Sequence, residues 1–363
     1  MKTIDDLPTP AVLIELPVLE ANIARQAGRA REAGVALRPH CKTHKSPQIA
    51  RMQLAAGARG ISLAKTSEAE VFAREGLDDI FLAYPVVGLG KPERLLALSE
   101  KIRLSVGVDS VEGAEALSVV FARSGRRLDV LLKIDCGYGR VGVPPENAAA
   151  LARGIGKLPG VALTGVFTHG GQAYTAETPG QTAKAADQEG QSVVDAARAL
   201  ADAGLPVKTI SVGSTPSARL VMKVPGVTEC RPGNYVFHDR SQVALGACEP
   251  SDCAMTVLAT VVSVPSLERA VLDAGSKTLS TDPLRPGGPG YGLVLGSQSR
   301  IEKLSEEHGV VAVAPGDSFR VGQRVRILPN HACVISNLHD RLYGVRAGSV
   351  ETEFAVAARG RVE

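Results

Sequence analysis

Residues 103-RLSVGVDSVEGAEALSVVFARSGRRLDVLLKID-135 contain an apolar run, a helical pattern and a second apolar run. The two runs, 103–110 and 128–135, have the length and composition of buried strands. The segment between them, 111–125, is rich in Ala, Leu, Glu and Arg and ends at a Gly suited to the position just after a helix. The stretch therefore predicts a strand, a helix and a second strand, which is the building unit of a parallel sheet.

The same alternation runs through most of the chain from residue 17 onward. The pattern 19-LEANIARQAGRAREAG-34 predicts another helix of this kind. We expect eight buried strands at 36–41, 60–65, 80–85, 103–110, 128–135, 162–170, 209–214 and 227–237. Eight strand–helix units predict an α/β fold with a (β/α)8 barrel, and a doubly wound open sheet is the alternative.

After residue 240 the helical periodicity fades and a mainly β C-terminal domain is expected. Strand-like segments bounded by Gly and Pro occur at 254–264, 269–275, 308–316, 324–330 and 341–351. The run 11-AVLIELP-17 precedes the first helix and is expected to pair with these strands. The expected domains are thus 1–16 as a strand joining the β domain, 17–240 as the barrel, and 241–363 as the β domain. A Pro/Gly-rich loop, 280-STDPLRPGGPGYG-292, is long enough to reach a site or a neighbouring subunit.

The composition argues against nucleic acid and membrane as partners. The 41 basic and 38 acidic residues nearly balance, aromatic residues make up only 4%, and Trp is absent. No apolar stretch has the length of a membrane span, and the N-terminus does not resemble a signal peptide. Six scattered cysteines without CxxC pairs indicate reduced thiols in a cytoplasmic protein.

Reactive side chains follow the ends of the expected strands, where barrel enzymes place their chemistry. Lys42 follows the first strand, and His169 lies at the end of the sixth. Small residues follow the last two strands, in turns of the kind that bind phosphate through backbone N–H groups. A lysine facing a phosphate-binding wall suggests a pyridoxal phosphate Schiff base. The residues of the two turns are Gly213, Ser214, Thr215, Gly233, Asn234 and Tyr235.

Seven stretches together resemble one family of pyridoxal phosphate enzymes. They are 38-RPHCKTHKS-46, 134-IDCGYGRVGV-143, 168-THGGQAY-174, 212-VGSTPS-217, 231-RPGNYVFHD-239, 306-EEHG-309 and 329-PNHAC-333. The chain is similar to the metal-dependent D-serine dehydratases, D-threo-3-hydroxyaspartate dehydratases and D-threonine aldolases, which have the alanine-racemase-like fold. The resemblance implies a barrel followed by a β domain, and a homodimer whose sites draw on both subunits.

The resemblance also implies roles for individual residues. Lys42 would carry the cofactor. Arg140 would lie near its phenolic oxygen, His169 against its ring and Tyr174 near the pyridine nitrogen. The phosphate would be held by the two turns named above, 213–215 and 233–235.

A metal site is expected at His331 and Cys333. We expect both side chains on one face of an extended strand, because residues i and i+2 of a strand point the same way. Imidazole and thiolate suit Zn²⁺, with Mn²⁺ or Mg²⁺ as alternatives. In the family, dehydratases resemble this sequence in having His-x-Cys, whereas aldolases have aspartate at the position of Cys333.

These features predict a lyase of a small D-3-hydroxy amino acid. The favoured reaction is dehydration of D-serine or D-threo-3-hydroxyaspartate to a 2-oxo acid and ammonia. The alternative is retro-aldol cleavage to glycine and an aldehyde, as in D-threonine aldolases. An amino-acid racemase using Tyr291 or Tyr343 as second base, and a non-catalytic pyridoxal phosphate carrier, are less favoured.

Overall fold

The computed structural model of the protein describes residues 2–363, which form two compact units. The barrel unit consists of Gln26–Lys42, Ala50–Gly233 and Arg361–Glu363. The β unit consists of the described residues up to Arg25, together with Thr43–Ile49 and Asn234–Gly360. The chain therefore passes between the units several times.

Eight parallel strands form the sheet of the barrel unit in the order β2-β9-β8-β7-β6-β5-β4-β3. A parallel bridge between His40 and Ser62 joins the first strand to the last and closes the ring. All eight expected strands are confirmed, and the closure rules out the doubly wound open sheet. The strands are β2 (Ala36–Leu37), β3 (Ile61–Leu63), β4 (Asp79–Pro85), β5 (Arg103–Val108), β6 (Leu128–Lys133), β7 (Val161–Phe167), β8 (Thr209–Val212) and β9 (Glu229–Cys230).

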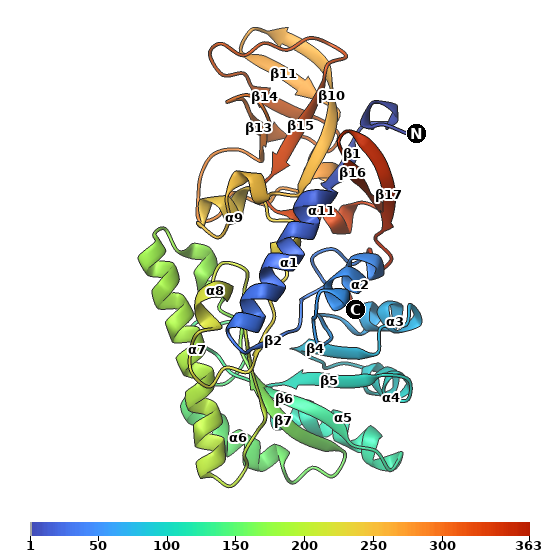
Figure 1. Cartoon of the computed structure of the whole chain (residues 1–363). Helices are drawn as coiled ribbons and strands as arrows, with labels where there is room; N and C mark the ends of the chain where they lie inside the picture. Colours follow the sequence, from blue (N-terminus) through green and yellow to red (C-terminus); the bar gives the residue numbers. More distant parts are fainter. Residues whose placement is uncertain (1) are drawn as a thin grey trace. The chain divides into compact units, whose positions relative to one another are not determined.

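Helices alternate with these strands and flank the sheet on its outer side (Figure 1). The helix expected at 111–125 begins where the Ser110 side chain accepts a hydrogen bond from the Gly113 N–H and ends before Gly125, whose φ is 70°. The helices are α1 (Leu16–Glu32), α2 (Pro47–Ala55), α3 (Thr66–Arg74), α4 (Lys91–Ser99), α5 (Val111–Arg123), α6 (Ala148–Ile155), α7 (Pro179–Asp202) and α8 (Ala218–Val221), with short 3-10 turns η2 (Pro145–Asn147) and η3 (Gly171–Thr175).

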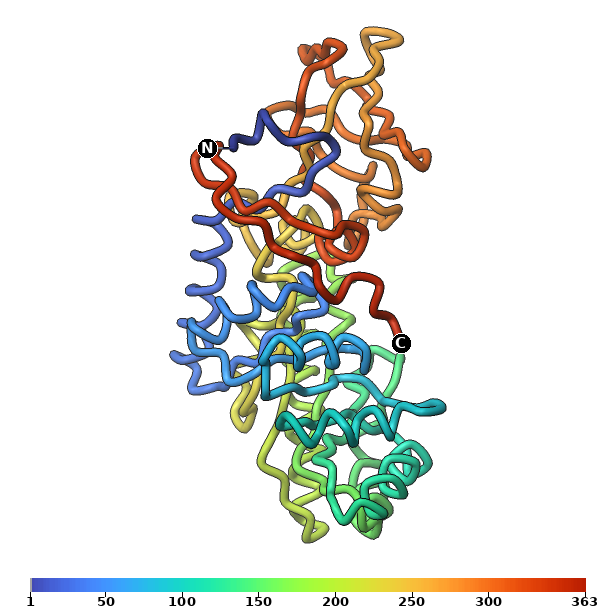
Figure 2. The backbone as a smooth tube through the Cα atoms, turned by 90° about the vertical axis from the view of Figure 1, so that its right-hand side faces the viewer, coloured from blue at the N-terminus to red at the C-terminus, as the bar shows by residue number. Residues whose placement is uncertain are grey.

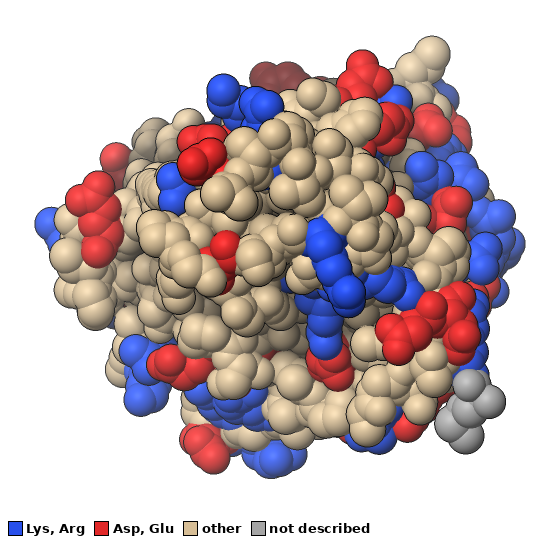
Figure 3. Space-filling model, turned by 90° about the horizontal axis from the view of Figure 1, so that it is seen from above, with Lys and Arg blue, Asp and Glu red and all other residues tan. Residues whose placement is uncertain are grey.

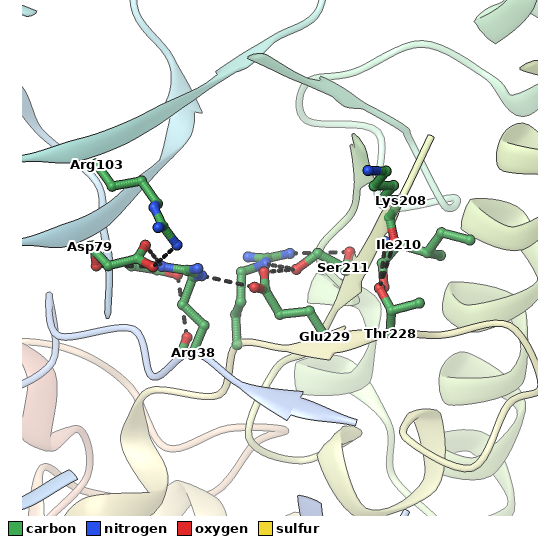
Figure 4. Close-up of polar contacts among 10 residues, drawn as sticks. Arg38, Asp79, Arg103, Lys208, Ile210, Ser211, Thr228 and Glu229 are labelled. Atoms are coloured by element: carbon green, nitrogen blue, oxygen red, sulfur yellow. Dashed lines mark hydrogen bonds and ion pairs between the residues drawn. The ribbon is translucent and has the colours of Figure 1, made fainter. Parts of the chain in front are cut away.

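The barrel interior combines aromatic packing with a buried ionic network. The rings of Phe81 and Phe167 meet edge to face with centroids 5.0 Å apart. Arg38 reaches across strands to Asp79 (2.6 Å) and Glu229 (2.8 Å), as Figure 4 shows. Glu229 also accepts a hydrogen bond from Ser211 at 2.7 Å. Arg38 and Glu229 are almost completely buried, so their charges depend on one another for solvation.

The β unit contains a nine-stranded sheet in the order β11-β14-β13-β12-β15-β10-β1-β16-β17. An additional pairing of β11 with β10 closes its first six strands into a barrel. The strands are β1 (Ala11–Glu15), β10 (Met255–Ser266), β11 (Arg269–Leu272), β12 (Gly292–Val294), β13 (Arg300–Leu304), β14 (Gly309–Ala312), β15 (Arg324–Pro329), β16 (Arg341–Arg346) and β17 (Ser349–Ala355). Shorter elements are η1 (Ile4–Asp6), η4 (Asn234–Val236), α9 (Arg240–Ala244), η5 (Pro250–Asp252), α10 (Ser276–Leu279) and α11 (Ala332–Leu338).

The first strand joins this sheet, as expected. β1 pairs antiparallel with β10 and parallel with β16, so it lies within the sheet and not at its edge. The N-terminal segment also lies beside the β16–β17 hairpin (Figure 2), where the Ile4 N–H donates to the Gly348 carbonyl at 3.0 Å. Residues at opposite ends of the chain therefore build one sheet.

The expected pattern of C-terminal strands needs two corrections. The segment 341–351 is not one strand, because it turns at Ala347 and Gly348, both with positive φ, and returns as β17. The short strands β12 and β13 were not expected, since each has few residues and neither shows a long apolar alternation.

The surface and the helices show two further features. Basic and acidic side chains are interspersed over the face seen in Figure 3. Among the described residues, no helix combines the length and the apolar character that a membrane crossing requires.

Candidate functional site

Lys42 follows β2 at an end of the barrel where several positive charges gather. The pKa values of His40 and His169 lie well below the usual value, mainly because both rings are buried. The neighbouring charge of Lys42 lowers both further. The other cations that act on the two imidazoles include Arg140 and Arg231 for both, and Lys133 for His169. The structure thus brings Lys42, Arg140 and His169 together, as expected.

The ring of His169 is held from several sides. Its Nδ1 lies 3.3 Å from the Gly213 carbonyl oxygen. Because the imidazole is neutral, Nδ1–H donates to this carbonyl and Nε2 keeps a lone pair. The rings of Tyr138 and Tyr174 lie 6.1 and 6.3 Å away, between centroids.

Arg140 lies in a loop organised by the Asp135 carboxylate. Asp135 Oδ1 accepts the N–H groups of Gly137, Tyr138 and Gly139 at 3.0–3.1 Å. The Arg140 guanidinium lies over the Tyr138 ring, 5.1 Å from its centroid. The 134–143 motif therefore positions one cation and one aromatic ring beside His169.

The 213–217 turn combines a tight backbone with one buried hydroxyl that has no partner. Gly213 has a φ of 121°, and a Cβ there would come within 2.8 Å of the Arg231 nitrogen and the Cys230 sulfur. Ser214 Oγ lies 2.8 Å from Ser217 Oγ. The Thr215 hydroxyl is buried and has no hydrogen-bond partner. A buried hydroxyl without a partner costs free energy, so this atom fits a phosphate oxygen acceptor.

The Gly213 N–H is already engaged within the protein. It donates to Glu189 Oε1 at 2.7 Å. Gly213 would therefore serve a phosphate through its backbone conformation and missing side chain, while its own N–H points to the carboxylate.

Of the second turn, Gly233 belongs to the barrel unit, whereas Asn234 and Tyr235 belong to the β unit. Asn234 Nδ2 donates to Asp239 Oδ2 at 2.6 Å and lies 3.7 Å from Cys333 Sγ. Its Oδ1 is buried and has no hydrogen-bond partner. Tyr235 is 3% exposed. The amide of Asn234 is thus directed toward the expected metal ligands.

His331 and Cys333 meet, but not on a strand. Helix α11 begins at Ala332, so His331 is the extended residue before it and Cys333 lies in its first turn. The helix starts here because the buried Asp239 Oδ2 accepts the Ala332 N–H at 2.9 Å. The expectation of an extended i, i+2 pair was wrong.

The electrostatics of the pair favour a thiolate. Burial raises the pKa of Cys333, but the charge and hydrogen bond of His331 outweigh burial, and the pKa is lowered. Burial likewise opposes the charge on His331, but Cys333, Asp282 and Asp239 outweigh it and raise the pKa of the imidazole. His331 Nδ1 is 2.6 Å from Asp282 Oδ2. A carboxylate on Nδ1 leaves Nε2 as the atom available to a metal.

The donor set fits a metal with open coordination positions. Among residues 2–363, no group of three or more His, Cys, Asp or Glu side chains is arranged to hold an ion. His331 and Cys333 would therefore supply two ligands, and substrate or water would complete the shell. An imidazole and a thiolate suit zinc better than the hard cations Mg²⁺ and Mn²⁺.

Four residues of this region were not expected from the sequence. Glu189 lies in a helix without a motif of its own, and Lys133 lies inside a strand pattern. Asp239 ends the 231–239 stretch, but no role was assigned to it. Asp282 had a signal, because it lies in the Pro/Gly-rich loop 280–292 that we expected to reach a site. For the others, only burial and contacts in the folded chain reveal a role.

The sequence also matches known families and proteins. Residues 14–241 match the alanine racemase N-terminal domain, and residues 254–345 match the putative serine dehydratase domain. D-threo-3-hydroxyaspartate dehydratase of Delftia sp. (strain HT23) is 37% identical, with 96% of this chain and 97% of that protein covered. The solved structure of a Cys→Ala variant of a D-threo-3-hydroxyaspartate dehydratase in a metal-free form has a TM-score of 0.90 at 36% identity and covers 98% of this chain and 99% of that one.

An aldolase is about as similar. D-threonine aldolase of Arthrobacter sp. is 35% identical, with 97% of this chain and 93% of that protein covered. The structure of D-threonine aldolase from Filomicrobium marinum has a TM-score of 0.93 at 31% identity and covers 100% of this chain and 98% of that one. Dehydratases and aldolases are both lyases. The chain therefore belongs to the family of lyases in which an alanine racemase N-terminal domain precedes a serine dehydratase domain.

Proposed function

We propose that the protein is a pyridoxal phosphate- and zinc-dependent dehydratase of D-3-hydroxy amino acids such as D-serine or D-threo-3-hydroxyaspartate. The products are a 2-oxo acid and ammonia. One observation carries the proposal: Cys333 Sγ lies 3.3 Å from Thr43 Oγ1, and Thr43 follows Lys42 directly in the chain. The candidate metal ligand thus contacts the neighbour of the candidate cofactor lysine.

The residues at the barrel end would hold the cofactor. Lys42 would attach it, and Arg140, His169 and Tyr174 would surround its ring. Pyridoxal phosphate, when bound, supplies an electron sink for the charge left on the substrate α-carbon. The buried, partnerless hydroxyl of Thr215 supports the phosphate position. The remaining phosphate-binding residues are Gly213, Ser214, Gly233, Asn234 and Tyr235.

The protein side chains would accept and donate the protons of the reaction. Lys42 Nζ would take the proton from the substrate α-carbon, acting as the general base of the site. His169 contributes a neutral face, since its pKa is held low and its Nδ1–H is bound to the Gly213 carbonyl. It therefore adds no positive charge beside the cofactor ring.

His331 and Cys333 would hold the metal, with Asp282 fixing the imidazole. Zn²⁺, when bound, supplies a Lewis acid for the β-hydroxyl, a poor leaving group by itself. Mn²⁺ and Mg²⁺ are the alternatives. The thiol of Cys333 favours zinc.

We further propose a homodimer in the cytoplasm. All six cysteines are free thiols, as in proteins of a reducing compartment. The family resemblance supports the dimer.

The aldolase reaction is the second candidate, because D-threonine aldolases match the chain over nearly its full length. The same residues would serve it, with the β-hydroxyl losing its proton and the Cα–Cβ bond breaking. The products would be glycine and an aldehyde.

Product analysis of the purified protein, loaded with cofactor and zinc, tests the proposal. D-serine, D-threonine and D-threo-3-hydroxyaspartate are offered separately. We expect a 2-oxo acid and ammonia in equal amounts, and no product after EDTA treatment or in Lys42→Ala. Formation of glycine and an aldehyde would show that the protein is an aldolase and not a dehydratase. Inversion of the substrate without cleavage would indicate a racemase.

A further inference from the structure

Helix α7 places a carboxylate directly behind the 213–217 turn. Glu189 is completely buried. Its Oε1 accepts the Gly213 N–H at 2.7 Å, and its Oε2 accepts the Ser217 hydroxyl, also at 2.7 Å. One side chain thus binds both ends of the turn.

These bonds set the direction of the hydroxyl groups. An ionised carboxylate only accepts hydrogen bonds, so Ser217 must donate its single proton to Glu189. Ser217 Oγ is then the acceptor of the 2.8 Å bond from Ser214 Oγ. The two serines are thereby ordered, and the hydroxyl of Thr215 is left as the buried donor without a partner.

The same carboxylate also borders the His169 turn. A Cβ on Gly170 would overlap with Glu189 Oε2. This contact explains why the residue after His169 has no side chain. Glu189 therefore lies between the two segments that are expected to hold the phosphate and the ring of the cofactor.

A negative charge behind a phosphate site needs a physical reason, because it repels the dianion. The charge has a nearby positive partner in the buried Arg231, whose protonated form it favours. A carboxylate is also the one side chain that accepts two strong hydrogen bonds without donating any. Its two bonds can hold the turn in one shape before any anion arrives.

We propose that Glu189 is the positioning residue of the phosphate-binding turn. It holds Gly213 and Ser217 so that the turn is already shaped for a phosphate monoester dianion. The inference rests on the proposed function, because it assumes that the cofactor phosphate binds this turn. Glu189 itself does not touch the phosphate.

The test compares two ligands that differ only in the phosphate group. Dissociation constants of pyridoxal phosphate and of pyridoxal are measured on the apoprotein by absorbance and fluorescence titration. We expect Glu189→Ala to weaken pyridoxal phosphate binding about tenfold or more, since the buried Gly213 N–H loses its acceptor. Pyridoxal binding should change little. The ³¹P resonance of the bound cofactor should also broaden or shift.

Two further variants separate positioning from folding. Glu189→Gln keeps an acceptor for Gly213 and should restore most of the affinity, whereas Ser217→Ala should give an intermediate loss. Asp195→Ala is the matched control, because Asp195 lies on the same helix and bonds only local, exposed partners. It should bind both ligands as the wild type does. If Glu189→Ala does not fold, the other two variants still test the role of Glu189. Ser217→Ala should then bind pyridoxal phosphate more weakly than Glu189→Gln does, and equal affinities would contradict the proposal.

The outcomes separate the role of Glu189 from the assignment of the cofactor. Equal weakening of pyridoxal phosphate and pyridoxal in Glu189→Ala, or no weakening of either, would overturn the role of Glu189 alone. A wild-type apoprotein that binds pyridoxal as tightly as pyridoxal phosphate would remove the phosphate site, and with it the cofactor assignment.

Discussion

Lys133 carries a buried amine near the barrel end that holds His169. Burial lowers its pKa to about 7, and the charges of Arg231 and Arg140 act in the same direction. In the unfolded chain the amine has a pKa of about 10.4. The unfolded chain therefore binds more protons than the folded chain between these values, and the unfolding free energy rises with pH across this window.

The first prediction follows from this titration. Lys133→Met removes this titration. The unfolding free energy of the variant should therefore exceed that of the wild type most at pH 6.5, and progressively less at pH 8 and 9.5. Urea denaturation of the apoprotein at the three pH values measures the difference. A constant difference would mean that the amine is not held neutral by burial.

The second prediction concerns Asp282, whose carboxylate bonds His331 Nδ1. Asp282→Asn should reduce the affinity for zinc about 10- to 100-fold, because the imidazole loses the group that orients it and raises its basicity. Competition with a chromogenic chelator measures this affinity. Asp340→Asn, which changes an exposed carboxylate paired with Arg359, is the control. Unchanged zinc affinity in Asp282→Asn would argue against His331 as a ligand.

Among the helices and strands, the beginnings of α9 and α11 depend on one side chain. Asp239 caps α9 by accepting the Gln242 N–H, and its other oxygen accepts from Ala332 and Asn234. All three donors would be left without an acceptor if the carboxylate were removed.

We therefore expect Asp239→Ala to lower the unfolding free energy by about 3 kcal/mol, from a lost cap and unpaired buried donors. Thr178→Ala is the comparison, because Thr178 caps α7 through a single exposed bond to Gln181 and should cost about 1 kcal/mol. Chemical denaturation measures both variants. Equal losses would show that the bonds to α11 and Asn234 contribute nothing.

For the complete chain, the order of strands links distant residues. β1 lies between β10, about 240 residues later in sequence, and β16, about 330 residues later. Deletion of residues 2–15 should therefore expose two strand edges, together with Leu258 and Val345, which pack against Leu13 in the intact chain. We expect aggregation or rapid proteolysis of the β unit, measured by size-exclusion chromatography and limited trypsin digestion. A soluble, protease-resistant variant would contradict this.

Local pattern was sufficient to predict the barrel. Each strand of the ring is a short apolar run next to a helical pattern, and eight such units predicted the barrel. The same units also allowed a doubly wound open sheet, which only the His40–Ser62 bridge excludes. Lys42 and His169 were also predictable, because strand ends meet at one rim in this fold. Arg140 was expected only from the family resemblance. The separation of β16 from β17 was not, because a positive φ at Ala347 leaves no composition signal.

Sequence alone thus determined the order of elements, the fold and the stretches that carry the chemistry, since these depend on neighbours along the chain. Tertiary structure decided how the charged side chains are paired. Cys333 is in a helix because Asp239, far away in sequence, binds the Ala332 N–H. Glu189 faces the phosphate turn, and Asp282 faces His331, because packing brings distant segments together. Burial then sets their electrostatics, and burial is a property of the folded chain.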